Sequence, residues 1–205
     1  ANCTIKAVYD TPNAGNGKTV TVTVTLTVEA AKLYKFANGT ITDTFTIDGY
    51  INKAEPELSL SMDKTEFLKG DWLYDHISIS GVMENAEVTY HRAPSPLATG
   101  SEEYDSGNPM ITSFTPADES GEFWVYATTA ETDNYKPGRT AAIHIAVLDF
   151  CKVSFEPNGG SLPIGDRQKK LPWGRAYGEL PTPSPKEGYE FIGWYTAAEG
   201  GEKIE

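Results

Sequence analysis

Residues 19–28 read Thr-Val-Thr-Val-Thr-Val-Thr-Leu-Thr-Val, a run in which hydroxyl and aliphatic side chains alternate without a break. Successive side chains of a β-strand point to opposite faces, so this run predicts a strand with one apolar and one hydroxylated face. The segment Asn13-Ala14-Gly15-Asn16-Gly17 precedes it with residues that tolerate a positive φ. The sequence therefore predicts a turn followed by a half-buried strand.

A second alternating segment, 40–47, follows the turn residues Ala37-Asn38-Gly39. We expect it to pair with 19–28 in a hairpin or small sheet. The side chains expected to face inward are Ile41, Phe45 and Ile47. Ala54-Glu55-Pro56 then interrupts the pattern, since proline cannot donate to a strand ladder, and we place a domain boundary there.

Beyond Pro56 the chain consists of short alternating runs separated by turns rich in Gly and Pro. The predicted strands are 57–62, 77–80, 86–91, 110–114, 122–129 and 140–148. Six or seven strands over roughly 95 residues is the spacing of an immunoglobulin-like sandwich. No segment of helical length carries an apolar stripe with a cap and a stop, and 28–35 has room for at most two helical turns. The predicted fold class is all-β.

A third region opens at Cys151 with a short strand, 151–156, and a turn at Pro157-Asn158-Gly159-Gly160. Its large apolar anchors near the end are Phe191 and Trp194, which is a marginal core for about 55 residues. We therefore expect three tandem β modules. Their bounds are 1–54, 55–150 and 151–205.

Net charge excludes two classes of partner. The chain has 17 basic and 29 acidic side chains, a net charge of −12, which would repel nucleic acid and anionic lipid. By module the net charges are +1, −12 and −1, so the middle module carries the whole excess. No apolar stretch approaches the roughly 20 residues of a membrane-spanning helix.

The sequence lacks the arrangements of residues that hydrolytic enzymes use. There is no Gly-x-Ser-x-Gly elbow, and the three histidines, His76, His91 and His144, are expected on the surface. His144 in particular alternates with the apolar Ile143 and Ile145. We therefore expect no enzyme activity, no catalytic residue and no bound cofactor.

Carboxylates gather in the turns of the middle module. The candidates are Glu102, Glu103, Asp105, Asp118, Glu119 and Glu122. A solvated acidic surface is the favoured interpretation, and a glycosidase pair or a calcium site are the alternatives. Because no calcium-loop motif is present, we expect weak or no stabilisation by calcium. The two cysteines, Cys3 and Cys151, form no metal motif, and two buried thiols are favoured over a disulfide bridge.

Among the four tryptophans, Trp72 and Trp124 are the candidate ligand contacts. Indole rings stack on sugars and fill hydrophobic pockets alike. Packing or contacts between modules are the favoured role, and ligand binding is the alternative.

Five motifs of the third region follow one another in a specific order. They are VSFEPNGG at 153–160, WG at 173–174, YGELPTP at 177–183, KEGYEFIGWY at 186–195 and GG at 200–201. In this order they resemble the internalin-type B-repeat, or Listeria–Bacteroides repeat, of bacterial cell-surface proteins. The resemblance covers 151–205 and implies a small β-grasp-like module. The family usually closes with a further strand, so we expect this copy to be truncated.

The other two regions resemble surface repeats more loosely. Val8-Tyr9-Asp10, 13–22 and Ile51-Asn52-Lys53-Ala54 are similar to YDG-type repeats, which implies that 1–54 is a partial module. GEFWVYA at 121–127 and Asp133-Asn134-Tyr135 are similar to bacterial immunoglobulin-like stalk domains.

These resemblances imply a non-enzymatic stalk or adhesive segment, extracellular, on a bacterial cell surface or cell wall. Its partners would be neighbouring repeats of the same chain. The short linkers 53–56 and 148–150 would hold the modules end to end. One alternative is a module that binds a host protein or glycan through its acidic loops or through Trp72 and Trp124. Another is an accessory module of a secreted carbohydrate-active enzyme.

Overall fold

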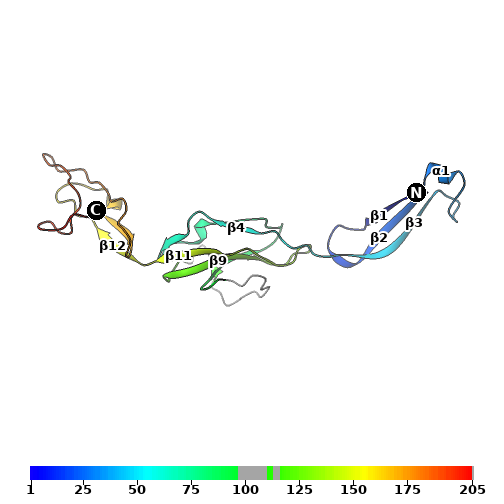
Figure 1. Ribbon diagram of the computed structural model, residues 1–205, viewed down its shortest axis with the longest axis horizontal. Coiled ribbons are helices and arrows are strands. Elements are labelled where there is room, and N and C mark those ends of the chain that lie inside the picture. Colours follow the sequence, from blue (N-terminus) through cyan, green and yellow to red (C-terminus); the bar gives the residue numbers. More distant parts are fainter. Residues whose placement is uncertain (97–109, 113–115, 205) are drawn as a thin grey trace. The chain divides into compact units, whose positions relative to one another are not determined.

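The computed structural model describes residues 1–96, 110–112 and 116–204. Their regular secondary structure is almost entirely β-strand, which confirms the predicted all-β class (Figure 1). The chain divides into two compact units. Unit 1 comprises Ala1–Leu60, Ile79–Thr89 and Ala127–Ala141, and unit 2 comprises Ser61–Ser78, Tyr90–Tyr126 and Ala142–Glu205. The division into three modules stays a prediction.

The N-terminal part of unit 1 is a three-stranded antiparallel sheet in the order β1-β2-β3. Its strands are β1 (Cys3–Tyr9), β2 (Gly15–Leu26) and β3 (Thr42–Ile51). The alternating run 19–28 supplies the central strand β2, which pairs with both neighbours. Residues directly opposite one another share a face, so Ala7, Val22 and Phe45 lie in one apolar row across the sheet. Val20 and Val22, at its centre, are buried.

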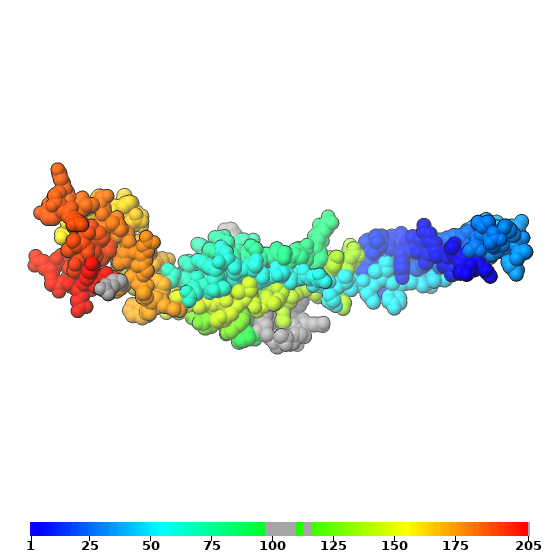
Figure 2. Space-filling model, turned by 45° about the horizontal axis from the view of Figure 1, so that its top comes forward, coloured from blue at the N-terminus to red at the C-terminus, as the bar shows by residue number. Residues whose placement is uncertain are grey.

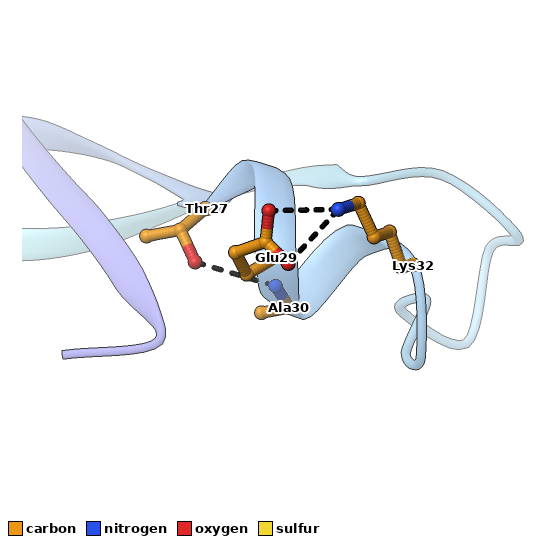
Figure 3. Close-up of polar contacts among 4 residues, drawn as sticks. All are labelled: Thr27, Glu29, Ala30 and Lys32. Carbon is orange, nitrogen blue, oxygen red and sulfur yellow. Dashed lines mark hydrogen bonds and ion pairs between the residues drawn. The ribbon is translucent and has the colours of Figure 1, made fainter.

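Strand β2 ends at Leu26, two residues before the expected end, because Thr27 begins a helix. Thr27 keeps an extended backbone while its hydroxyl accepts a hydrogen bond from the Ala30 amide at 3.4 Å (Figure 3). This is the geometry of an N-cap, and it starts the one-turn helix α1 (Val28–Ala31). Lys32 Nζ lies 2.8 and 2.9 Å from the carboxylate oxygens of Glu29, one turn back.

The expectation that Ile41, Phe45 and Ile47 face inward is wrong. These side chains are 46%, 49% and 50% exposed. Phe45 and Ile47 do lie on the apolar face of the sheet, opposite Val22 and Val20. Alternation predicts the face correctly, but the described residues place no second layer over this part of it.

The described residues of the central region form eight strands in two sheets. They are β4 (Ser59–Met62), β5 (Glu66–Leu68), β6 (Ile77–Ser80), β7 (Val88–Ala93), β8 (Met110–Ile111), β9 (Gly121–Thr129), β10 (Gly138–Arg139) and β11 (Ile143–Leu148). One sheet has the order β5-β11-β9-β7-β8, with β10 on β9, and the other is β4-β6. Strand β5 runs parallel to β11. This arrangement is consistent with immunoglobulin-like modules.

Each of the six runs predicted here overlaps a strand. The run 77–80 matches β6 at both ends, while 110–114 contributes only Met110–Ile111, and 113–114 lie outside the described residues. Strands β5 and β10 are not predicted by the sequence pattern, because three and two residues are too few to show alternation. In unit 2 the core is formed by large side chains that are 2% exposed or less, namely Phe67, Leu73, Val125, Ile145 and Val147.

The C-terminal part of unit 2 pairs β12 (Phe150–Ser154) with β13 (Gln168–Pro172). Phe155, Leu162 and Leu171 are its buried apolar residues. Trp194 packs on Phe155 and Phe191, with ring centroids 5.0 and 5.4 Å away, and its indole N–H donates to the Pro181 carbonyl at 2.8 Å. Phe191 and Trp194 are thus the anchors that the sequence predicts.

Candidate functional site

The linker at residues 53–56 is tied to a loop far along the chain. Ala54 forms a parallel bridge with Tyr135, in which the Ala54 amide donates to the Asn134 carbonyl at 2.9 Å. The Lys136 amide in turn donates to the Ala54 carbonyl at 3.0 Å. A linker residue that bonds through both its amide and its carbonyl has little freedom to rotate. We call residues 13–14, 53–55 and 131–136, all in unit 1, the first junction.

Side chains reinforce the first junction. Lys53 Nζ lies 2.6 Å from the Thr132 carbonyl and 2.6 Å from Glu131 Oε1. Asn134 accepts a hydrogen bond from the Ala14 amide at 2.7 Å and donates to Asn13 Oδ1 at 3.2 Å. The turn between β1 and β2 is therefore attached to the same loop as the linker.

The sequence indicates the linker but not what holds it. The motif Asp133-Asn134-Tyr135 carries only a family resemblance, and hydrogen bonds over 120 residues leave no local pattern. The available signal is chemical: asparagine side chains favour backbone groups in turns. The same loop lines an open hollow of about 520 Å³ with Met83, Glu84 and Asn85.

A second junction lies in unit 2, where Asp149 alone separates β11 from β12. Its carbonyl accepts a hydrogen bond from the Trp173 amide at 2.8 Å, and its carboxylate accepts one from Ser120 Oγ at 2.9 Å. The preceding Leu148 carbonyl accepts from the Lys69 amide at 2.9 Å. The predicted linker 148–150 is thus fixed by backbone and side-chain bonds on both sides of Asp149.

Trp124 lies on β9 directly opposite His144 of β11. The two rings are tilted by 44° with centroids 4.8 Å apart, and His144 Nε2 lies 2.7 Å from Glu122 Oε2. The imidazole and the carboxylate are more than half exposed, and the indole is half-buried. We call Trp124, His144 and Glu122 the Trp124 cluster. An aromatic face beside a hydrogen-bonding carboxylate and imidazole is suited to a polar ligand with an apolar face, such as a sugar.

Trp72 is 44% exposed and follows a tightly bonded turn. The Gly70 amide donates to the Ala117 carbonyl at 2.7 Å, and the Ala117 amide donates to the Asp71 carbonyl at 2.8 Å. Trp72 itself bridges to Pro116. The ring contacts of the described residues do not join Trp72 to Trp124, so the two indoles are separate candidates. Their role as ligand contacts stays a prediction.

The surface position expected for the histidines is correct for His144 and only partly correct for His91, which is half-buried. The His91 ring stacks on Tyr126 at 5.0 Å with an interplanar angle of 16°, and its Nδ1 is buried. Tyr126 shares a strand face with Trp124 yet is buried, because that face of β9 is covered toward its C-terminal end. His76 is mostly buried as well, 2.8 Å from Asp63 Oδ1. Alternation along a strand predicts on which face of the sheet a side chain lies, but it does not predict whether other parts of the protein cover that face.

The candidate carboxylates that the structure describes in the middle region, Asp118, Glu119 and Glu122, lie beside basic groups. Asp118 and Glu119 lie 3.1 and 3.9 Å from Arg92 Nη2 and are mostly exposed. Arg92 itself is buried over the Phe123 ring, 4.4 Å from its centroid. Glu102, Glu103 and Asp105 lie outside the described residues. Within 1–96, 110–112 and 116–204, no group of three or more His, Cys, Asp or Glu side chains is placed to hold a metal ion.

Three further properties of the described residues bear on chemistry and location. Burial, together with the neighbouring Tyr74, raises the pKa of Tyr90 above its ordinary value of 10.0. Cys3 and Cys151 are free, half-buried thiols. No helix in the described part of the chain is long and apolar enough to cross a membrane.

Comparison with known proteins identifies the C-terminal part of the chain. Residues 152–205 match the Listeria-Bacteroides repeat domain, which confirms the resemblance drawn from the motifs of the third region. The search of curated proteins finds no match to the chain. The family is typical of bacterial surface proteins and suggests that this chain comes from a bacterial surface repeat protein.

Proposed function

We propose that this chain is a non-enzymatic, extracellular segment of a bacterial cell-surface protein and that it acts as a stalk in an adhesive region. The repeat at 152–205 supports the surface assignment. The observation that carries the stalk role is the pair of junctions, where both short linkers are hydrogen-bonded on either side.

A stalk must keep the part it presents away from the wall, and a flexible linker does this poorly. The ends of a flexible chain are separated by a distance that grows only with the square root of its length. A linker of a few residues whose amides and carbonyls are engaged cannot behave in this way. Each such bond adds about 0.5–1.5 kcal/mol against bending the linker away from its partners.

The stalk proposal can be tested with the two native thiols. Donor and acceptor dyes on Cys3 and Cys151 report the separation of two points in the chain, and we expect one narrow distribution of transfer efficiency. A variant with Gly-Gly-Ser-Gly inserted after Ala54 is expected to broaden it, because the insertion releases the first junction. The same insertion after Gly39, in the turn before β3, is the control and should leave the distribution narrow. A wild-type distribution as broad as that of the junction variant would contradict the stalk role.

The surface assignment needs its own experiment. Antibodies raised against the 205-residue chain should label intact cells of the bacterium that makes it, and brief protease treatment of those cells should remove the label. Labelling that requires permeabilised cells would exclude an extracellular stalk.

A second candidate function is ligand binding by the middle region, and the geometry of the Trp124 cluster favours it. A screen of glycans and host proteins would identify a ligand, and Trp124→Ala or Trp72→Ala should abolish its binding while the fold is retained. Trp173→Ala is the matched control, because this indole is 72% exposed but lies in the C-terminal repeat. Loss of binding in the control alone would exclude both predicted contacts.

A further inference from the structure

One edge of the N-terminal sheet has no strand beside it among the described residues. Strand β1 pairs with β2 on one side only. The Asp10 amide donates to the Thr19 carbonyl at 2.9 Å, and the Thr27 amide donates to the Asn2 carbonyl at 3.0 Å. Bonding groups alternate along an antiparallel strand, so the even-numbered residues of β1 bond to β2. The N–H and C=O groups of Cys3, Ile5, Ala7 and Tyr9 therefore point outward, at the free edge.

This edge is long, accessible and weakly protected. The N-terminal segment that contains β1 lies at the surface (Figure 2, dark blue). All residues of β1 except Cys3 are exposed, Ile5 to 68% and Tyr9 to 41%. An open edge with apolar side chains is a template for another strand, and proteins usually block it with proline or several charges. Strand β1 has no proline, and Lys6 is its one charged residue.

We propose that two copies of this chain associate through β1, whose strands pair antiparallel about a two-fold axis to make one continuous six-stranded sheet. The inference goes beyond the stalk role and does not depend on it. The strand that pairs with this edge is β1 of a second copy. Pairing of β1 with itself matches the faces of the two sheets, allows a register with favourable side-chain pairs and brings opposite charges close together.

Among antiparallel pairings of the free edges, the faces of the sheet match only when like edges meet. The Leu26 amide donates to the Ile41 carbonyl at 2.9 Å, so the odd-numbered residues of β3 bond to β2 and Thr42, Thr44 and Thr46 point their amides outward. Hydrogen-bonded partners share a face. Antiparallel pairing of β1 with β3 would thus join the apolar face of one copy to the hydroxyl face of the other.

Charge and symmetry exclude the other combinations. Pairing of β3 with β3 would bring together four carboxylates, Asp43 and Asp48 of each copy, on strands that carry no cation. Parallel pairing of β1 with β3 matches the faces, but it leaves free edges at both ends and produces an open polymer. Pairing of β1 with β1 closes after two copies, as most soluble oligomers do.

The register follows from the side chains of β1. With Ala7 opposite Ala7 of the second copy, Ile5 lies opposite Tyr9, a favourable aromatic and β-branched pair. Lys6 then lies opposite Val8 and diagonal to both Lys6 and Asp10 of the second copy, so the symmetric dimer has two attractive diagonal pairs and one repulsive pair. Neither Lys6 nor Asp10 has an ion pair among the described residues. A register centred on Lys6 would instead set two ammonium groups opposite each other, and one centred on Ile5 would pair only 3–7.

Sedimentation of the full 205-residue chain over a range of concentrations tests the proposal. We expect a weak monomer–dimer equilibrium, since the paired edge is smaller than a standard interface. Ala7→Pro removes an outward amide without breaking a bond to β2, and it should weaken association by about tenfold or more. Thr46→Pro places the same change at an outward position of β3 and should leave association unchanged. Circular dichroism checks that both variants fold.

Two further sets of variants test the partner and the register even if Ala7→Pro does not fold. Lys6→Glu should weaken the dimer, and adding Asp10→Lys should restore it, because the diagonal pairs then form with reversed sign. Ala7→Cys, in a background with Cys3→Ser and Cys151→Ser, should form a disulfide between copies, since hydrogen-bonded pairs have Cα atoms about 5.5 Å apart. Thr46→Cys in the same background should not.

Other results would overturn the proposal. A chain that stays monomeric up to about 1 mM, the affinity of a very weak contact, has no such interface. Polymers instead of dimers would indicate parallel β1–β3 pairing. A dimer that survives Ala7→Pro and is lost with Phe45→Asp would indicate association through the apolar face of the sheet.

Discussion

At the scale of single residues, Gly81 shows how closely the backbone packs in unit 1. Its φ is +79°, and a Cβ there would lie 1.9 Å from the Glu57 carbonyl oxygen. We expect Gly81→Ala to lower the free energy of unfolding by about 2–4 kcal/mol, because it adds backbone strain to a clash that only backbone movement relieves. Urea denaturation measures this loss. Gly165→Ala is the control: a Cβ there would have no atom within 4 Å and its φ is ordinary, so the effect should stay within about 0.5 kcal/mol.

The raised pKa of Tyr90 predicts that the folded protein loses stability at high pH. Its pKa is raised by burial and by Tyr74, so the folded protein keeps the phenol proton at a pH where the unfolded chain has lost it. The unfolded state then binds fewer protons, and the free energy of unfolding falls as the pH rises through the ordinary value of 10.0 toward the folded pKa. Below that range the contribution is fully present. Denaturation between pH 8 and pH 11, about the span in which tyrosine titrates, measures the slope.

The comparison that isolates Tyr90 is Tyr90→Phe. Other tyrosines and lysines titrate in the same range, so only the difference between the two proteins is informative. The variant should lose less stability than the wild type on going to high pH. Identical slopes would show that the Tyr90 hydroxyl does not contribute.

At the scale of elements, the first junction predicts that Lys53 stabilises unit 1. Lys53→Ala removes the bond to the Thr132 carbonyl and the ion pair with Glu131. Since Lys53 is one-third exposed and Glu131 more than half, the pair itself is strongly screened. We expect the free energy of unfolding to fall by about 1 kcal/mol, most of it from the lost hydrogen bond.

The matched control for Lys53 is Lys32, which pairs with Glu29 on helix α1 (Figure 3). Both of these side chains are mostly exposed, so Lys32→Ala should change stability by less than about 0.5 kcal/mol. Thermal and urea unfolding compare the two. Equal losses would mean that the junction adds nothing beyond a surface ion pair.

Strands were predictable where alternation is long. The run 19–28 supplies most of β2, because ten residues that alternate without a break fit the period of a strand and no other. The strand ends earlier than predicted because the Thr27 hydroxyl caps a helix. The orientation of Phe45 was also predictable, but its exposure was not, since exposure depends on whether a second layer covers the sheet. The same limit explains His91, which the sequence places beside a predicted strand without showing that its ring stacks on Tyr126.

The junctions were predictable only as linkers. Proline at position 56 and the change of pattern at 148–150 mark the ends of strands, which are local properties. The groups that hold these linkers lie further along the chain: the Asn134 carbonyl accepts from the Ala54 amide, and the Trp173 amide donates to the Asp149 carbonyl. Pairings over such separations are decided by the folded chain. In contrast, the C-terminal repeat was predictable from its ordered motifs.

For the whole molecule, the uneven charge distribution predicts how stability responds to salt. The excess of acidic groups lies within residues 55–150, which contain 17 acidic and five basic side chains. Such an excess destabilises the folded state by self-repulsion, and salt screens it. The exposed ion pairs that salt also weakens are worth little. We therefore expect the melting temperature to rise with sodium chloride, and a fall would show that attractive pairs dominate.

The effect of calcium on the melting temperature distinguishes general screening of charge from binding at a specific site. A specific site requires six to eight oxygen ligands held together, and binding would stabilise the folded state in proportion to its affinity. Two of the candidate carboxylates that the structure describes pair instead with basic groups, Asp118 with Arg92 and Glu122 with His144. Calcium at constant ionic strength should therefore shift the melting temperature by less than about 2 °C relative to chelator. Magnesium at the same concentration is the control, and a larger shift produced by calcium alone would establish a site for that ion.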